Sequence, residues 1–189
     1  MKVLKFGGKS LANGKGIENA IEIIIGKINK AENIAVVVSA RGNTTDDLEA
    51  ILEKASQKKE YKTALEVFKK YQLAPNNEVD FSNEFATLET IFEGVSLLGD
   101  YSMKIKDTVL AQGELLAAKL VFSLLQIQGV SANIADASQL IITDENFGNA
   151  QPIHAISSAN VITYFAKNTK VLNVVTGFIS SNKKGETTT

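Results

Sequence analysis

The stretch VLKFGGKS, residues 3–10, decides how the chain folds, because it has the pattern of a short strand followed by two glycines. Residues 14–31 then place isoleucine and alanine side chains at helical spacing, which predicts an amphipathic helix. Residues 34–38 form a β-branched run that is typical of a parallel strand covered on both faces. Strand, helix and strand in this order predict a βαβ unit with a right-handed crossover.

Helix and strand patterns alternate along the rest of the chain. Helices are predicted at about 44–57, 60–72, 80–99, 104–128 and 155–166, and strands at about 130–135, 140–143 and 171–176, with a hairpin over 177–189. This order predicts an α/β fold in which an open, mostly parallel sheet is sandwiched by helices, with a helical insertion at about 56–103. The threonine run 187–189 ends the sequence inside the second arm of the hairpin, so we expect a truncated domain.

Composition and charge narrow the possible functions. The 189 residues carry a formal net charge of −1 and no concentrated basic run, which argues against a nucleic-acid partner. The absence of cysteine excludes disulfides, thiol chemistry and cysteine-based metal sites, and the single histidine, His154, cannot form a multi-histidine site. The opening residues run directly into a strand pattern without a secretory signal, and no apolar run approaches the roughly 20 residues that span a bilayer. We therefore expect a cytoplasmic protein with no membrane partner.

The lysine and serine that end the opening stretch suggest the phosphate-binding loop of a nucleotide hydrolase, but the spacing does not fit. That loop needs a glycine six places before its lysine. The residue six places before Lys9 is Val3, which lies inside the predicted strand. The unusual residue is instead Lys5, a charge between two apolar strand residues.

Lys5 has two interpretations, both set by its place at a strand end, where ligands of open α/β sheets collect. It extends to water, or it is a fixed positive charge that faces a phosphoryl group. Gly7 and Gly8 favour the second interpretation, because glycines let backbone N–H groups approach an anion closely. The helix that follows would present its positive N-terminal end to the same anion.

Glu114 is the second unusual residue. The residues three and four places away on either side of it on the predicted 104–128 helix, and Val121 seven places after it, are apolar, which predicts a buried carboxylate. Gly113 suggests a close approach at this point, since glycine in a helix interior costs about 1 kcal/mol relative to alanine. A buried carboxylate needs a cation or hydrogen-bond donors. The partner is either a lysine elsewhere in the chain or the ammonium group of a small substrate.

Three aspartates have more than one interpretation. Asp46 and Asp47 suit a metal site, but they also suit the first turn of a helix after a cap at Thr44 or Thr45, which we favour. Asp136 follows a predicted strand and is either a turn residue or a contact at the edge of the sheet.

Four blocks of sequence occur in a fixed order: KFGGKS at 5–10, VVSA at 37–40 with Thr45, GEL at 113–115, and VTGFI at 175–179 leading to GETTT at 185–189. Together they resemble the amino-terminal part of an aspartokinase of the amino-acid kinase family. The resemblance covers essentially the whole chain. The opening and residues 36–48 are most similar to the bifunctional aspartokinase–homoserine dehydrogenases.

The resemblance implies the amino-acid kinase fold and the transfer of a phosphoryl group from ATP, with Mg²⁺, to the side-chain carboxylate of L-aspartate. The product would be 4-phospho-L-aspartate, in the first step of lysine, threonine and methionine biosynthesis. The resemblance also implies that the full-length protein is a homo-oligomer.

The resemblance also assigns roles to single residues. Lys5 would neutralise charge on the transferring phosphoryl group while Gly8 donates a backbone hydrogen bond, so these two are the predicted catalytic residues. The residues predicted to bind ATP are Lys5, Gly7, Gly8 and Ser10, and those predicted to bind aspartate are Ser39, Thr45, Glu114 and Phe178. Glu114 would hold the substrate ammonium group, the two hydroxyls would hydrogen-bond the amino acid, and the aromatic ring would lie beside it. No residue is assigned to a metal.

The chain departs from the family pattern in two residues and in length. Lys9 stands where threonine is usual and Asp46 where asparagine is common. In this family the threonine run leads into Gly-Arg-Gly-Gly-Ser-Asp, which supplies a substrate-binding arginine and a catalytic aspartate, followed by the nucleotide lobe and regulatory domains. The sequence ends before them, so we expect the 189 residues alone not to turn over.

Two alternatives stay open. The first is another amino-acid kinase, acting on acetylglutamate or glutamate, although the 56–103 insertion and the 39–45 loop argue against it. The second is a non-catalytic binding or assembly module of the same fold.

Overall fold

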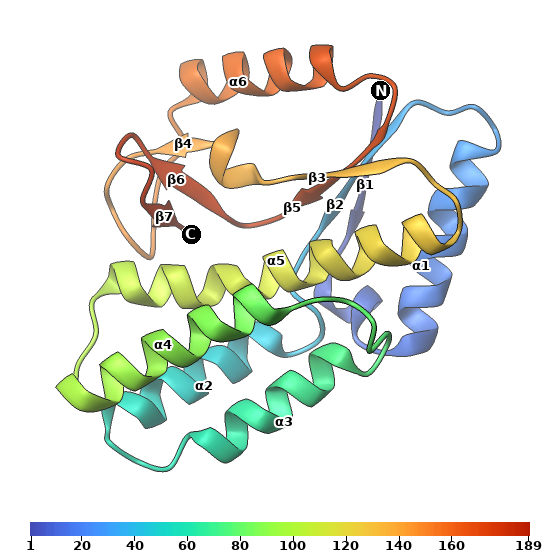
Figure 1. The fold of residues 1–189 in the computed structure, drawn as a ribbon. Helices are drawn as coiled ribbons and strands as arrows, with labels where there is room; N and C mark the ends of the chain where they lie inside the picture. The colour runs from blue at the N-terminus through green and yellow to red at the C-terminus, as the bar shows by residue number, and fades with distance from the viewer.

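The main sheet has four parallel strands. The structure is a computed structural model that describes residues 1–189. In spatial order the strands are β1 (Lys2–Phe6), β2 (Ile34–Val38), β5 (Leu172–Thr176) and β3 (Ala132–Ala135) (Figure 1). All of them run in the same direction, so their carboxyl ends meet at one edge of the sheet.

Helices cover both faces of this sheet, which confirms the predicted fold class. Helices α1 (Gly14–Ile28) and α5 (Met103–Ile127) lie on one face, and α6 (His154–Lys167) lies on the other (Figure 1). The βαβ unit predicted from the opening residues is β1, α1 and β2.

Strand β1 is an edge strand, and its two faces have different surroundings. Leu4 and Phe6 pack against the core, whereas Val3 and Lys5 are exposed on the opposite face. The lysine therefore does not disturb the apolar core, although it lies within an apolar run.

A second layer of helices lies beside α5. It consists of α2 (Thr44–Ser56), α3 (Lys62–Leu73) and α4 (Ser82–Leu98) (Figure 1). Helices α2 and α4 pack against α5, and α3 packs against α2. The predicted helices at 44–57, 60–72, 80–99 and 104–128 are confirmed to within two residues at either end. Because α5 lies between this layer and the sheet, even its polar side chains are buried along much of its length.

Helix α5 is long and apolar enough to cross a membrane, which the sequence analysis did not expect. Its most apolar window is 67% buried inside the protein. The core helix of a soluble protein has the same length and composition, so this finding is weak support for a membrane span.

A smaller sheet stands apart from the main one. It consists of β4 (Ile142–Thr143), β6 (Ser180–Asn182) and β7 (Thr187–Thr188). Strands β6 and β7 form the predicted hairpin, and its turn contains Gly185 at φ +76°. The sequence predicted the strand around 140–143 but not that it pairs with β6 in a second sheet.

Candidate active site

The loops that follow β1, β2 and β5 meet at the carboxyl edge of the main sheet. The Ser39 amide donates to the Phe6 carbonyl at 3.1 Å, and the Gly177 amide donates to the Val38 carbonyl at 2.7 Å. These hydrogen bonds extend the sheet by one residue on each strand. The first residues of the three loops therefore lie side by side.

Two glycines allow this close approach. A Cβ atom on Gly8 would lie 2.6 Å from the Ala40 carbonyl oxygen, and one on Gly177 would lie 2.8 Å from the Val38 carbonyl oxygen. The Gly42 amide also donates to the Gly8 carbonyl at 2.9 Å. Packing of backbone against backbone thus requires glycine at both positions, independently of any ligand.

Lys5 lies next to the first glycine of its own loop. A Cβ atom on Gly7 would lie 3.2 Å from the Lys5 Nζ, so the amine is directed back over the loop. Lys5 is exposed and makes no hydrogen bond or ion pair with the rest of the protein. An unpaired cation next to a glycine turn is free to bind an anion.

The segment after the glycines differs from the prediction. Residues Gly8–Leu11 form a 3₁₀ turn, η1, in which the exposed Ser10 donates its amide to the Gly7 carbonyl at 2.9 Å. Helix α1 begins at Gly14, the start that the sequence predicted, and the Asn13 Oδ1 accepts from the Gly16 amide at 2.8 Å. The amides beside the glycines therefore belong to a short turn, and the predicted contribution of the α1 N-terminus is not supported.

Glu114 is buried, as predicted, with 3% of its surface exposed. Its Oε1 accepts from the Ala40 amide at 3.0 Å, while its Oε2 is buried without any hydrogen-bond partner. Burial raises the pKa of this carboxyl group to about 7, and the Ala40 hydrogen bond acts in the opposite direction. No lysine pairs with Glu114, so the interpretation as a structural ion pair is wrong.

Gly113 lets α5 approach the loop after β2, as predicted. A Cβ atom on Gly113 would lie 2.9 Å from both the Ala40 Cβ and the Thr44 Cγ2. The missing side chain lets the Ala40 amide come within hydrogen-bonding distance of the neighbouring Glu114. The glycine therefore has a packing role that fixes the position of the carboxylate.

The remaining predicted substrate residues lie near these loops. Ser39 is half-buried, and its Oγ lies 3.6 Å from the position of a Cβ atom on Gly177. Thr45 is half-buried in the first turn of α2. Phe178 is 61% exposed and has φ +62°, the left-handed conformation that is uncommon for a bulky residue. Backbone strain of this kind tends to occur at functional sites.

The cap predicted for α2 is wrong. The helix begins at Thr44 itself, with Asn43 before it, and neither residue makes a capping hydrogen bond. Thr44 is instead buried, and its Oγ1 accepts from the Gln72 Nε2 at 2.7 Å. Asp46 and Asp47 do lie in the first turn, as predicted.

Carboxylates do not gather into a metal site. No group of three or more histidine, aspartate or glutamate side chains is placed to hold a metal ion. Asp136 is a turn residue, because its Oδ1 accepts from the Ser138 amide at 2.9 Å.

Sequence reasoning missed Arg41, which lies in the loop after β2 and is only 2% exposed. Burial lowers the pKa of its guanidinium, but an arginine stays protonated in a protein. The only signal in the sequence was a charged residue three places after the end of an apolar strand and next to Gly42. Its partners lie about 30 residues away in sequence and could not be recognised from local pattern.

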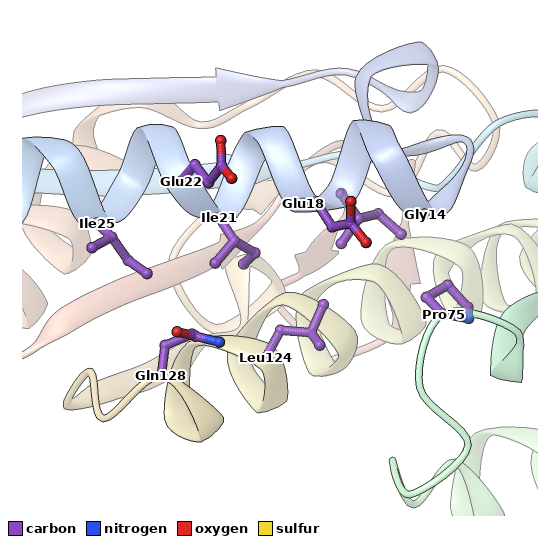
Figure 2. A pocket seen from close by; sticks show the side chains of 9 residues that line it. Gly14, Glu18, Ile21, Glu22, Ile25, Pro75, Leu124 and Gln128 are labelled. Carbon is purple, nitrogen blue, oxygen red and sulfur yellow. The ribbon is translucent and has the colours of Figure 1, made fainter.

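A separate cavity of about 300 Å³ lies between α1 and the C-terminal half of α5 (Figure 2). It contains none of the predicted site residues, and it is lined by Gly14, Ile17, Glu18, Ile21, Glu22, Ile25, Pro75, Leu124 and Gln128. Its wall combines aliphatic side chains with Glu18, Glu22 and Gln128, and none of its lining residues comes from the loops at the carboxyl edge of the sheet. We therefore place the candidate site at that edge.

Comparisons with known proteins identify the family of the chain. The sequence pattern of the amino acid kinase family matches residues 1–189. The chain is 27% identical over 200 residues to the bifunctional aspartokinase/homoserine dehydrogenase 2, chloroplastic, of Arabidopsis thaliana, covering 99% of this chain and 22% of that protein. It is 26% identical over 194 residues to the lysine-sensitive aspartokinase 3 of Escherichia coli (strain K12), covering 99% of this chain and 42% of that protein.

Solved structures share the fold. The crystal structure of E. coli aspartokinase III in complex with aspartate and ADP superposes with a TM-score of 0.87 at 25% identity, covering 100% of this chain and 43% of that chain. This chain thus spans less than half the length of each of these three proteins.

Proposed function

Because the chain belongs to the amino acid kinase family over its whole length, we propose that it is the amino-terminal part of an aspartate kinase. The full-length protein would transfer a phosphoryl group from ATP to the side-chain carboxylate of L-aspartate, giving 4-phospho-L-aspartate. The two relatives described above are an aspartokinase and an aspartokinase fused to a homoserine dehydrogenase. The structural neighbour binds aspartate and ADP.

The observation that carries the proposal is the unpartnered, buried Oε2 of Glu114. A carboxylate oxygen in this position costs free energy unless a cation or donor reaches it. The ammonium group of an α-amino acid supplies both the charge and the donors. Glu114 is therefore proposed to bind the substrate ammonium group, with Ser39 and Thr45 as hydrogen-bonding neighbours and Phe178 beside the substrate.

The transferred phosphoryl group is proposed to bind at the loop after β1. Phosphoryl transfer depends mostly on positioning and on neutralising negative charge. Lys5 has the required unpaired charge, and its Nζ lies beside Gly7, 3.2 Å from where a Cβ atom of that residue would be. The amides of Gly7 and Gly8 are proposed to donate to the same phosphate. Ser10 would support the same phosphate group.

Mg²⁺ is expected with ATP, but the residues of this chain do not form a site for it. The aspartates at the start of α2 lie in a helix turn, and no third acidic or histidine side chain joins them. We therefore assign no residue and no step to the metal. The homo-oligomer, the fused dehydrogenase and the cytoplasmic location also stay predictions for the full-length protein.

The proposal is tested with the full-length gene product, by following ADP release with L-aspartate, L-glutamate or acetylglutamate as acceptor. We expect release with aspartate only. Release with one of the other acceptors would identify a different amino-acid kinase, and no release with any acceptor would favour a non-catalytic module.

Lys5→Ala should lower kcat at least about a hundredfold, the scale of losing one preorganised group that stabilises transition-state charge. The matched control is Lys2→Ala, which removes an exposed lysine at the other end of the same strand, where it pairs with Glu32. The control should retain activity. Near-normal activity of Lys5→Ala would dismiss the phosphoryl role.

A further inference from the structure

Arg41 is a buried cation that is not paired with any carboxylate. Its Nε donates to the Leu11 carbonyl at 3.1 Å, and its Nη1 lies 3.2 Å from the Tyr71 carbonyl and 3.3 Å from the Gln72 carbonyl. It also lies 3.4 Å from the Gln72 Oε1. Burying a charge is costly unless it is hydrogen-bonded, so this set of neutral acceptors must be held in place around the guanidinium.

The acceptors come from the ends of two segments. Leu11 is the last residue of η1, while Tyr71 and Gln72 lie in the last turn of α3. Carbonyls in the last turn of a helix lack partners within the helix and carry partial negative charge. The guanidinium satisfies them and joins the end of α3 to the loop after β1.

Tyr71 and Gln72 strengthen the same junction. The Tyr71 hydroxyl donates to the Ala12 carbonyl at 2.6 Å, and its ring lies 4.6 Å from the centre of the Arg41 guanidinium. The Gln72 Nε2 donates to the Thr44 Oγ1 at 2.7 Å. The end of α3 therefore contacts both the loop after β1 and the start of α2.

Gly42 shows how tightly the three segments pack. Its φ is +52°, and a Cβ atom there would lie 2.5 Å from the Tyr71 hydroxyl. Its amide donates to the Gly8 carbonyl. A displacement of the end of α3 would therefore move the loop after β1, where phosphate is proposed to bind, and also the loop after β2, which contains Ser39.

We propose that Arg41 is a positioning residue, which holds the loop after β1 and the loop after β2 in fixed register by anchoring both on the C-terminal end of α3. The helical insertion at 56–103, which contains α3, would then help to hold the residues of the site in position. The kinetic consequence rests on the proposed function: the phosphate and amino-acid subsites should lose their alignment together when Arg41 is replaced. Lysine cannot replace it, because a single ammonium group lacks the planar set of donors that reaches acceptors on both sides.

The kinetic experiment compares Arg41→Met and Arg41→Lys with Phe92→Leu in the full-length protein. Phe92 is fully buried in α4, and its aromatic neighbour is Tyr61, at the opposite end of α3 from Tyr71 and Gln72. Its substitution should therefore lower stability without removing any of the Arg41 hydrogen bonds. At a temperature where all variants are folded, both Arg41 variants should lose about a hundredfold in kcat/KM for aspartate and for ATP, the scale of a misplacement of about 1 Å. Phe92→Leu should keep both values. Arg41 variants with lower melting temperatures but unchanged kinetics, or with a loss for one substrate only, would overturn the proposal.

Amide hydrogen exchange tests the junction without using activity, so its failure is distinct from failure of the kinase proposal. In Arg41→Met the amides of 7–12 and 39–45 should both exchange faster than in Phe92→Leu, while those of α6 stay unchanged. Tyr71→Phe, which removes only the hydroxyl bond to Ala12, should show a smaller effect in the same direction and provides a test if Arg41→Met does not fold. Unchanged exchange in both loops would overturn the proposal.

Discussion

Helix α5 carries two buried carboxylates about two turns apart, and their surroundings differ. Asp107 is 1% exposed, and both of its oxygens are paired: Oδ1 accepts from the Thr189 hydroxyl at 2.7 Å, and Oδ2 accepts from the Gly148 amide at 2.9 Å and the Thr189 amide at 3.2 Å. Glu114 has one donor for Oε1 and none for Oε2. Burial of a carboxylate alone therefore does not indicate a binding site, whereas a buried carboxylate oxygen without a hydrogen-bond donor does.

The two carboxylates also have different tasks in the fold. Asp107 ties the first turns of α5 to the loop before α6 and to the end of the chain, with donors that the protein itself supplies. Glu114 faces the loop after β2 at the edge of the main sheet, and burial raises its pKa to about 7. The first residue stabilises the protein, whereas the second costs stability until a ligand arrives.

The two carboxylates should differ most in how they affect the pH dependence of the free energy of unfolding. The pKa of Glu114 in the folded protein is about 7, above its ordinary value of 4.5, so the folded state keeps the proton longer than the unfolded state. The stability that protonated Glu114 contributes is complete below pH 4.5 and is lost as the pH rises through 7, by a total of the order of 3 kcal/mol. In ligand-free protein, the free energy of unfolding relative to Glu114→Gln should therefore fall between pH 4.5 and 7. Denaturant unfolding of both proteins at several pH values measures this difference, and a constant difference would contradict the assignment.

A smaller effect is expected at the other carboxylate. Asp107→Asn replaces one acceptor oxygen with an amide group that cannot accept from the Gly148 and Thr189 donors. The free energy of unfolding should fall by about 1.5–3 kcal/mol, the value of hydrogen bonds to a charged group. The affinity for aspartate should stay unchanged, as measured by calorimetric titration of the full-length protein. A large loss of affinity for aspartate without a loss of stability would show that Asp107, like Glu114, belongs to the binding site and not only to the fold.

The contrast also shows which features a sequence can predict. The burial of Glu114 followed from its apolar neighbours, and the bounds of β2 and α5 followed from strong hydrophobic periodicity. The lack of a partner for Oε2 did not follow, because it depends on which side chains approach α5 from distant segments. The same holds for Arg41, whose acceptors are backbone carbonyls about 30 residues away.

Short turns and strands were also predicted less well than long elements. The turns η1 and η2 (Ala137–Gln139) are too short to show a period, so they were not predicted. Strand β4 was predicted at 140–143, but its pairing with β6 in a second sheet was not. The start of α2 was misjudged for a related reason. Thr44 looked like a cap, but the tertiary contact with Gln72 takes its hydroxyl.

The most direct test of the central claim compares L-aspartate with succinate, which has the same two carboxylates and lacks the ammonium group. Binding to full-length wild-type protein and to Glu114→Gln is measured by calorimetric titration at pH 8, where Glu114 is ionised. We expect that the wild type prefers aspartate and that Glu114→Gln loses about 2–5 kcal/mol of that preference, as when one partner of a buried charge pair is removed. An equal preference for aspartate in both proteins would show that the Glu114 carboxylate does not receive the ammonium group.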